Sequence, residues 1–173
     1  LGYCGLRWGE AIALKVADVD LERRRITVHR SAVEVHGEIH LSTPKTDAST
    51  RLVPLPAIVI DSLRAELDGR RPGDLVFPGS DGDYMRRVRA SASSKSWWKT
   101  ALKTAGVETM VIHDLRHTAA SIAVNAGGNV KSVQRMLGHA SAAMTLDRYA
   151  DLFDDGLDRL LDQIDGAHDG SGD

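Results

Sequence analysis

Four side chains that could act on a phosphate ester lie between residues 111 and 151. His113 and Arg116 are three residues apart, so in a helix they share one face and can contact one ligand. A guanidinium matches two phosphate oxygens, and an imidazole can donate to a third or exchange a proton near neutral pH. Tyr149 could be a nucleophile if a base takes its proton or cations stabilise the phenolate. His113, Arg116 and His139 could supply both the base and the cations.

These residues and their order resemble the C-terminal half of the active site of the tyrosine recombinases, the phage integrase family. The matching stretches are H-D-L-R, the L-G-H turn that ends at His139, and Tyr149 ten residues later. The N-terminal half of that site needs an arginine on a helix and a lysine on a β-hairpin. The stretch G-L-R-W-G-E around Arg7 resembles the arginine motif, and T-P-K-T around Lys45 resembles the lysine turn. The matches lie in order across almost the whole chain, which makes the resemblance specific.

The resemblance implies an α+β fold, mainly α-helical, with a small antiparallel three-stranded sheet. It implies a catalytic domain over residues 1–165, and the Gly- and Asp-rich composition of residues 166–173 predicts a disordered tail. Family members normally carry a DNA-clamping domain before this point, so we expect the chain to be the C-terminal part of a longer protein.

The same resemblance implies DNA strand transfer without metal, ATP or another cofactor. Tyr149 would attack a backbone phosphorus, forming a 3′-phosphotyrosyl link and releasing a 5′-hydroxyl. Arg7 and Arg116 would clamp the non-bridging oxygens, where negative charge grows. Four further roles follow: Lys45 protonates the departing oxygen, His113 exchanges a proton with Tyr149, His139 hydrogen-bonds the phosphate, and Glu10 and Asp114 orient the arginines or cap helices.

The periodicity of apolar residues predicts the elements that must position this site. Four alternating segments, 25–29, 32–35, 39–41 and 51–55, predict a sheet of about three strands with Lys45 at its last hairpin. Apolar residues at helical spacing predict a helix that leads into Arg7 and continues to a stop at residues 18–20, a second helix after Pro56, and further helices in the region from 113 to 149. A last amphipathic helix begins after Asp151; it could fold back on its own domain, whereas the resemblance implies that it docks on a neighbouring protomer of a tetramer on DNA.

Charge is unevenly distributed along the chain. Residues 151–173 contain eight aspartates and one arginine. Positions 1–150 therefore contain 21 basic and 16 acidic residues, a net charge of +5. This value fits phosphate-backbone contacts and ordinary surface charge equally well. Beside a phosphodiester site, a basic segment between residues 84 and 103 favours backbone contacts. Its basic residues are Arg86, Arg87, Arg89, Lys95, Lys99 and Lys103.

Composition bounds the remaining possibilities. The 173 residues are 42% hydrophobic, enough for one well-filled core, and no apolar run approaches the length of a membrane span. The single cysteine excludes an internal disulfide and fits a reducing cytosol. We therefore expect a cytoplasmic protein with no membrane partner. The resemblance to the tyrosine recombinases implies that it is encoded by a bacterium or a phage and acts on the chromosome, with double-stranded DNA as its partner and no small-molecule substrate.

Three rival functions stay open at this stage. A type IB topoisomerase uses similar chemistry but religates the same strand. A catalytically silent helix-turn-helix module would explain the basic segment but would leave Arg7, Lys45, His113 and Tyr149 as coincidence. A metal-dependent hydrolase built on the histidines has little support, because their spacing is not that of a zinc site.

Overall fold

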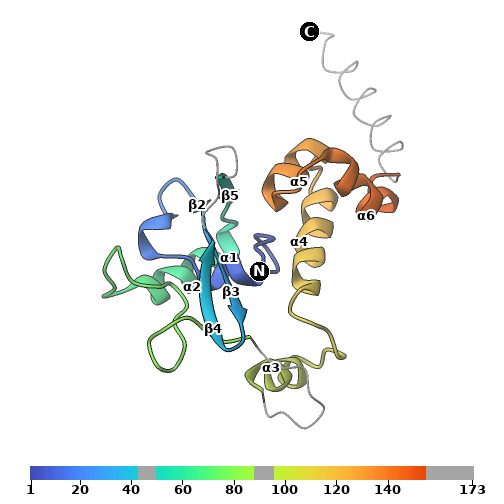
Figure 1. Cartoon of the computed structure of the whole chain (residues 1–173). Coiled ribbons are helices and arrows are strands. Elements are labelled where there is room, and N and C mark those ends of the chain that lie inside the picture. The colour runs from blue at the N-terminus through green and yellow to red at the C-terminus, as the bar shows by residue number, and fades with distance from the viewer. Residues whose placement is uncertain (43–49, 88–95, 155–173) are drawn as a thin grey trace.

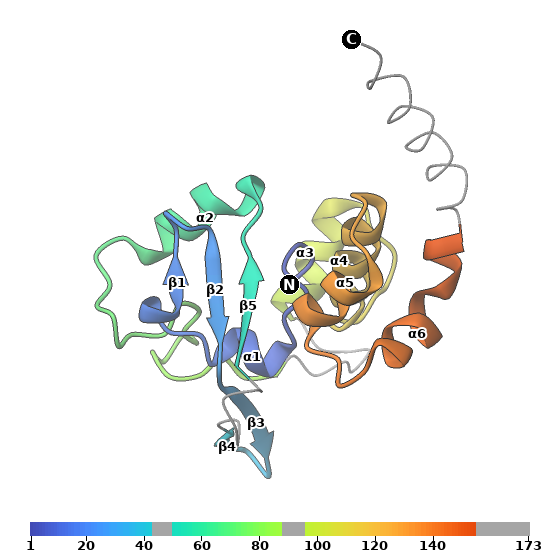
Figure 2. The ribbon, with the colours of Figure 1, turned by 90° about the horizontal axis from the view of Figure 1, so that it is seen from above.

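The computed structural model describes residues 1–42, 50–87 and 96–154 (Figure 1). One side of the molecule is built around a sheet and the other around helices, and the N-terminal residues run between them (Figure 2). In the described residues, no helix is long and apolar enough to cross a membrane. Lys45 and the helix expected after Asp151, apart from its first residues, lie outside the described residues.

The sheet side contains two separate antiparallel sheets. The three-stranded sheet has the order β1 (Val19–Asp20), β2 (Arg25–Val28) and β5 (Arg51–Pro54), with Ile26 opposite Val53 and Val28 opposite Arg51. Strands β3 (Ser31–Val35) and β4 (Glu38–Ser42) form a hairpin that projects from it (Figure 2). The prediction of a small antiparallel sheet is confirmed, but its strands differ from those expected. Strands β2 and β5 join the short strand β1, which alternation does not predict, and the other two alternating segments form their own hairpin. The strands before and after Lys45, β4 and β5, are therefore not paired with each other.

The N-terminal segment differs from the expected helix. Residues 2–4 form a turn, and the helix α1 (Trp8–Ile12) begins only after Arg7, which is its N-cap residue. The helix also ends at Ile12, before the stop expected at residues 18–20. Gly5 ends the turn with a φ of +62°. A side chain there would be strained and would also meet Leu137, whose Cδ2 lies 2.6 Å from the position of a Cβ atom. The glycine therefore allows the close approach of this loop to the helical side.

Short helices cover the sheet and form the second side. The 3₁₀ turn η1 (Val16–Asp18) follows α1, and α2 (Ala57–Leu67) begins after Pro56 as the sequence predicts. Helix α3 (Trp97–Ala105) stands apart at one end, and α4 (Asp114–Asn125), α5 (Val130–Leu137) and α6 (Ala142–Asp154) pack together (Figure 1).

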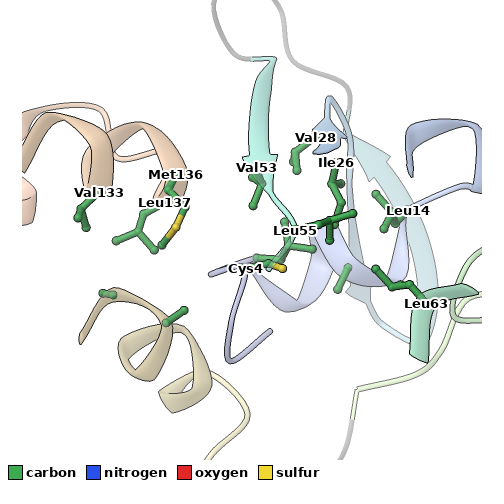
Figure 3. Close-up of a cluster of buried hydrophobic side chains, with 14 of the residues drawn as sticks. Cys4, Leu14, Ile26, Val28, Val53, Leu55, Leu63, Val133, Met136 and Leu137 are labelled. Carbon is green, nitrogen blue, oxygen red and sulfur yellow. The ribbon is translucent and has the colours of Figure 1, made fainter. Parts of the chain in front are cut away.

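One hydrophobic core joins the two sides. Ile26, Val53 and Leu55 from the sheet side and Val133 and Leu137 from α5 belong to the same cluster of buried side chains (Figure 3). Burial of such side chains is the main favourable contribution to folding. The continuous core therefore fixes α5 and α4 against the loop that carries Arg7.

Candidate active site

Three arginines from different elements donate to three consecutive carbonyl groups at the end of α5. Arg51 Nε lies 3.1 Å from the carbonyl oxygen of Met136, Arg116 Nη2 lies 2.5 Å from that of Leu137, and Arg7 Nη2 lies 3.2 Å from that of Gly138. The last carbonyls of a helix have no partner within the helix, and its C-terminus carries partial negative charge. The end of α5 is therefore suited to gather cations at one place.

Arg116 is the buried member of this group. Its side chain also donates to the carbonyl of Gly5, and the residue is only 4% exposed. Burial, and then the neighbouring Arg7 charge, lower its pKa to about 10, so the guanidinium is still charged at neutral pH. The two carbonyls hold the guanidinium between the N-terminal loop and α5.

Glu10 is shared between two of the arginines. Its carboxylate accepts hydrogen bonds from Arg51 Nη1 at 2.8 Å and Nη2 at 2.7 Å, and from Arg7 Nη1 at 3.0 Å. It also caps α1 by accepting from the Arg7 backbone N–H at 2.7 Å. Burial alone would raise the pKa of this carboxyl, but the bonds from Arg51 and Arg7 outweigh it and lower the pKa. A charged Glu10 thus orients Arg7, whose side chain is 44% exposed.

Tyr149 lies where α6 departs from helical geometry. Its φ of −134° and ψ of 18° interrupt the helix, and the residue is 5% exposed. The hydroxyl lies 2.8 Å from Nδ1 of His117. Burial raises the pKa of the phenol, while the charges of Arg116 and Arg148 oppose that rise. The phenol is therefore protonated at neutral pH and is hydrogen-bonded to an imidazole.

His139 follows the left-handed Gly138 that ends α5, as the sequence predicts. Its ring stacks on Tyr149 with the planes 6° apart and the centroids 6.5 Å apart, and its Nδ1 lies 2.9 Å from Thr145 Oγ1. Burial and the nearby arginines, Arg116 foremost, lower its pKa to about 4. His139 is therefore neutral at pH 7 and suited to hydrogen bonding rather than to proton donation.

His113 and Asp114 lie at the start of α4. Asp114 accepts from the backbone N–H of Val111 at 2.8 Å, so its carboxylate caps the turn that enters the helix. His113 is exposed, and its ring meets the edge of His117 with centroids 5.3 Å apart. Burial and the neighbouring His117 lower the pKa of His113. The bond to the Tyr149 hydroxyl comes from His117, one turn further along, whereas the expected proton exchange with His113 stays a prediction.

The basic segment is only partly described. Arg86 donates to the carbonyl of Gly37 at 2.6 Å, and the Arg87 backbone N–H donates to Glu34 at 3.3 Å, so this stretch contacts the β3–β4 hairpin. Lys99 and Lys103 lie on α3, well away from α6 in Figure 1. Arg89 and Lys95 lie outside the described residues. Contact of this segment with a DNA backbone stays a prediction.

Two residues of the site, Arg51 and His117, were not among the sequence candidates. The H-D-L-R-H-T stretch contains a signal for His117, because positions 113 and 117 are four apart and share a helix face. Arg51 had no such signal, since its partner Glu10 is 41 residues away and the contact depends on the pairing of β5 with β2. Within the described residues no group of His, Cys, Asp and Glu side chains is arranged to hold a metal ion.

The sequence profile described as the phage integrase family matches residues 1–155. The chain belongs to this family. A putative prophage phiRv2 integrase of Mycobacterium tuberculosis is 33% identical over 147 residues, which are 83% of this chain and 39% of that protein. The ICEBs1 integrase of Bacillus subtilis is 26% identical over 167 residues, or 93% of this chain and 45% of that protein. The chain thus spans about two fifths of the length of these curated relatives.

Solved structures show the same fold. The Tn1549 transposon integrase in complex with circular intermediate DNA superposes with a TM-score of 0.73 at 25% identity, over 92% of this chain and 57% of that chain. The XerA recombinase superposes with a TM-score of 0.62 at 23% identity, over 90% of this chain and 55% of that chain. The predicted family and fold class, an α+β tyrosine recombinase catalytic domain, are confirmed.

Proposed function

We propose that this chain is the catalytic domain of a site-specific DNA recombinase that cleaves and rejoins strands through a covalent 3′-phosphotyrosyl intermediate. One observation carries the proposal: the hydroxyl of a buried tyrosine is bonded to an imidazole in the same site as three arginines gathered at the end of α5. The relatives named integrase, and the DNA-bound integrase of similar fold, support DNA as the substrate.

The proposed reaction is an in-line displacement at phosphorus. Tyr149 Oη attacks a backbone phosphate, the bond to the 5′-oxygen breaks, and Lys45 supplies the proton that this oxygen takes. The cationic site lowers the energy of the transition state because it is oriented before charge develops, an effect of several kcal/mol in comparable sites. A 5′-hydroxyl of a partner strand reverses the step, so the link conserves the energy of the phosphodiester without metal or ATP.

Arg7 and Arg116 have different roles in binding the phosphate. Arg7 is the exposed guanidinium, so we assign it the direct contact with a non-bridging oxygen, and Arg116 stabilises the same phosphate from the buried side. Neutral His139 donates a hydrogen bond to the phosphate.

The proposal extends to assembly. Strand exchange needs two duplexes, and we infer a tetramer on DNA held through the segment after Asp151, with recombination-site DNA as the partner of each protomer.

A nicked suicide duplex tests the chemistry. The complete polypeptide that contains this chain is incubated with the duplex in EDTA, and a denaturing gel shows any covalent protein–DNA adduct. We expect an adduct with the wild-type protein and none with Tyr149→Phe, because the phenylalanine has no nucleophilic oxygen. Tight binding without adduct would refute the proposal and favour the silent DNA-binding module. Joining of a strand from a second duplex separates a recombinase from a type IB topoisomerase.

A further inference from the structure

The contact between His117 and Tyr149 gives the reacting oxygen a specific proton partner. Nδ1 of His117 is 2.8 Å from the phenolic hydroxyl, a normal hydrogen-bond distance. His117 is half-buried on α4, next to the buried Arg116, and Tyr149 comes from α6. The packing of α4 against α6 therefore sets the distance from the base to the nucleophile.

We propose that His117 is a catalytic residue that accepts the proton of Tyr149 during DNA cleavage, in place of the neighbouring His113. This proposal rests on the proposed function, since a proton acceptor is needed only if Tyr149 attacks. A phenol bonded to a neutral imidazole can lose its proton as it attacks, which avoids forming a free phenolate in a buried site.

The proton balance closes over both steps. As Tyr149 Oη forms its bond to phosphorus, its proton passes to His117 Nδ1, the P–O5′ bond breaks, and the 5′-oxygen takes a proton from Lys45. In the joining step the incoming 5′-hydroxyl returns a proton to Lys45, the P–Oη bond breaks, and imidazolium His117 returns its proton to the phenol. Nδ1 must be unprotonated at the start, so the neutral ring carries its proton on Nε2.

His113 is placed differently. It lies at the N-cap of α4, where its ring is exposed and touches His117 edge-on. An exposed imidazole one turn before the base is suited to contact the substrate. Replacing each histidine in turn therefore separates proton transfer from phosphate contact.

The decisive variant is His117→Asn in the complete polypeptide. An asparagine side-chain oxygen occupies nearly the position of Nδ1, so it can accept the bond from Tyr149 but cannot hold its proton at neutral pH. His117→Ala removes the bond as well, and His113→Asn is the matched control on the same helix. The substrate is a suicide duplex whose sequence is mapped beforehand by sequencing the DNA that the wild-type protein links to covalently. Circular dichroism and DNA binding establish that each variant is folded.

We expect single-turnover cleavage by both His117 variants to fall by about 10²- to 10⁴-fold, the usual contribution of a general base. His113→Asn should fall by less. In a second arm, 3,5-difluorotyrosine replaces Tyr149; its more acidic phenol depends less on a base, so it should accelerate His117→Asn more than the wild-type protein. A structural role for His117 would not produce this selective rescue.

Two results would overturn the assignment. One is cleavage by His117→Asn at close to the wild-type rate, and the other is an equal effect of the fluorinated tyrosine on variant and wild-type proteins. Either result counts against the assignment only if the wild-type protein forms a covalent adduct that Tyr149→Phe does not form. If the wild-type protein binds the DNA but forms no adduct, the proposed function fails instead, so the two failures are distinguishable.

Discussion

Replacing Arg51 with methionine removes the residue that ties β5 to α1 and α5. The guanidinium makes two bonds to Glu10, at 2.8 and 2.7 Å, and one to the Met136 carbonyl at 3.1 Å. Both side chains are largely buried, with exposed fractions of 14% for Arg51 and 7% for Glu10. The substitution therefore leaves a carboxylate buried with one cationic partner instead of two.

Breaking a buried ion pair by removing one member costs about 3–5 kcal/mol. Glu10 keeps its bonds to Arg7, so we expect a loss near the lower end, about 3 kcal/mol in the free energy of unfolding. For a chain of this size that loss corresponds to a fall in Tm of about 6–12 °C. Urea denaturation of the wild-type and variant proteins measures the difference. Arg64→Met is the matched control, because its pair with Asp61 is exposed on both sides, and its effect should stay within about 0.5 kcal/mol.

A double-mutant cycle isolates the pair from other losses. Glu10→Met and Arg51→Met are each measured alone and then together. Because apolar side chains often replace a buried pair at little cost, the double variant should lose about 1–3 kcal/mol less than the sum of the single losses. Additive losses, or an Arg51→Met loss below about 1 kcal/mol, would refute the view that this pair holds the site together.

Two further perturbations probe the same region. Gly138→Ala should destabilise the chain by about 1–3 kcal/mol more than Gly106→Ala. Both glycines are left-handed helix caps, but only at Gly138 would a Cβ atom meet Arg51, at 2.9 Å. Urea denaturation midpoints compare the two variants, and equal losses would contradict the steric argument. In the wild-type protein, the unfolded chain takes a proton on His139 first as the pH drops below 6.5, because the pKa of His139 in the folded protein is about 4. The free energy of unfolding therefore falls between pH 6.5 and about 4, and His139→Gln should make this fall smaller. His113, whose pKa is also lowered, should keep part of the slope, and an unchanged slope in His139→Gln would show that His139 is not the depressed group.

The motif residues could be predicted because each sits at a local signal. Arg116 and His113 have helical spacing, and His139 follows a glycine that ends a helix, so their positions on elements are readable from the sequence. The four alternating segments could be predicted as strands for the same reason, whereas β1 has only two residues and gives no such signal. Gly5 gives no local sign of a break, since a lone glycine near a helical pattern does not indicate that Leu137 packs against it.

The contacts between elements could not be predicted in the same way. The pairing of β3 with β4 instead of with β2, and the bond from Arg51 to Glu10, depend on strand register and on how α1 meets β5. These are decided by packing of the whole core rather than by any short stretch. His117 illustrates the intermediate case, because its helix face was readable but its distance to Tyr149 depends on the packing of α4 and α6.

The clustering of like charges is the physical feature that connects fold to proposed chemistry. Within the described part of the site, Arg7, Arg51 and Arg116 face the carboxylate of Glu10, so these four side chains together carry two positive charges in excess. Three carbonyl dipoles at the end of α5 make this arrangement tolerable without neutralising it. A phosphodiester beside the exposed Arg7 would supply part of the missing negative charge, and the additional charge of the transition state would supply more. Under the proposed function, the negative charge added in the transition state would make this incompletely neutralised site favour the transition state over the bound substrate.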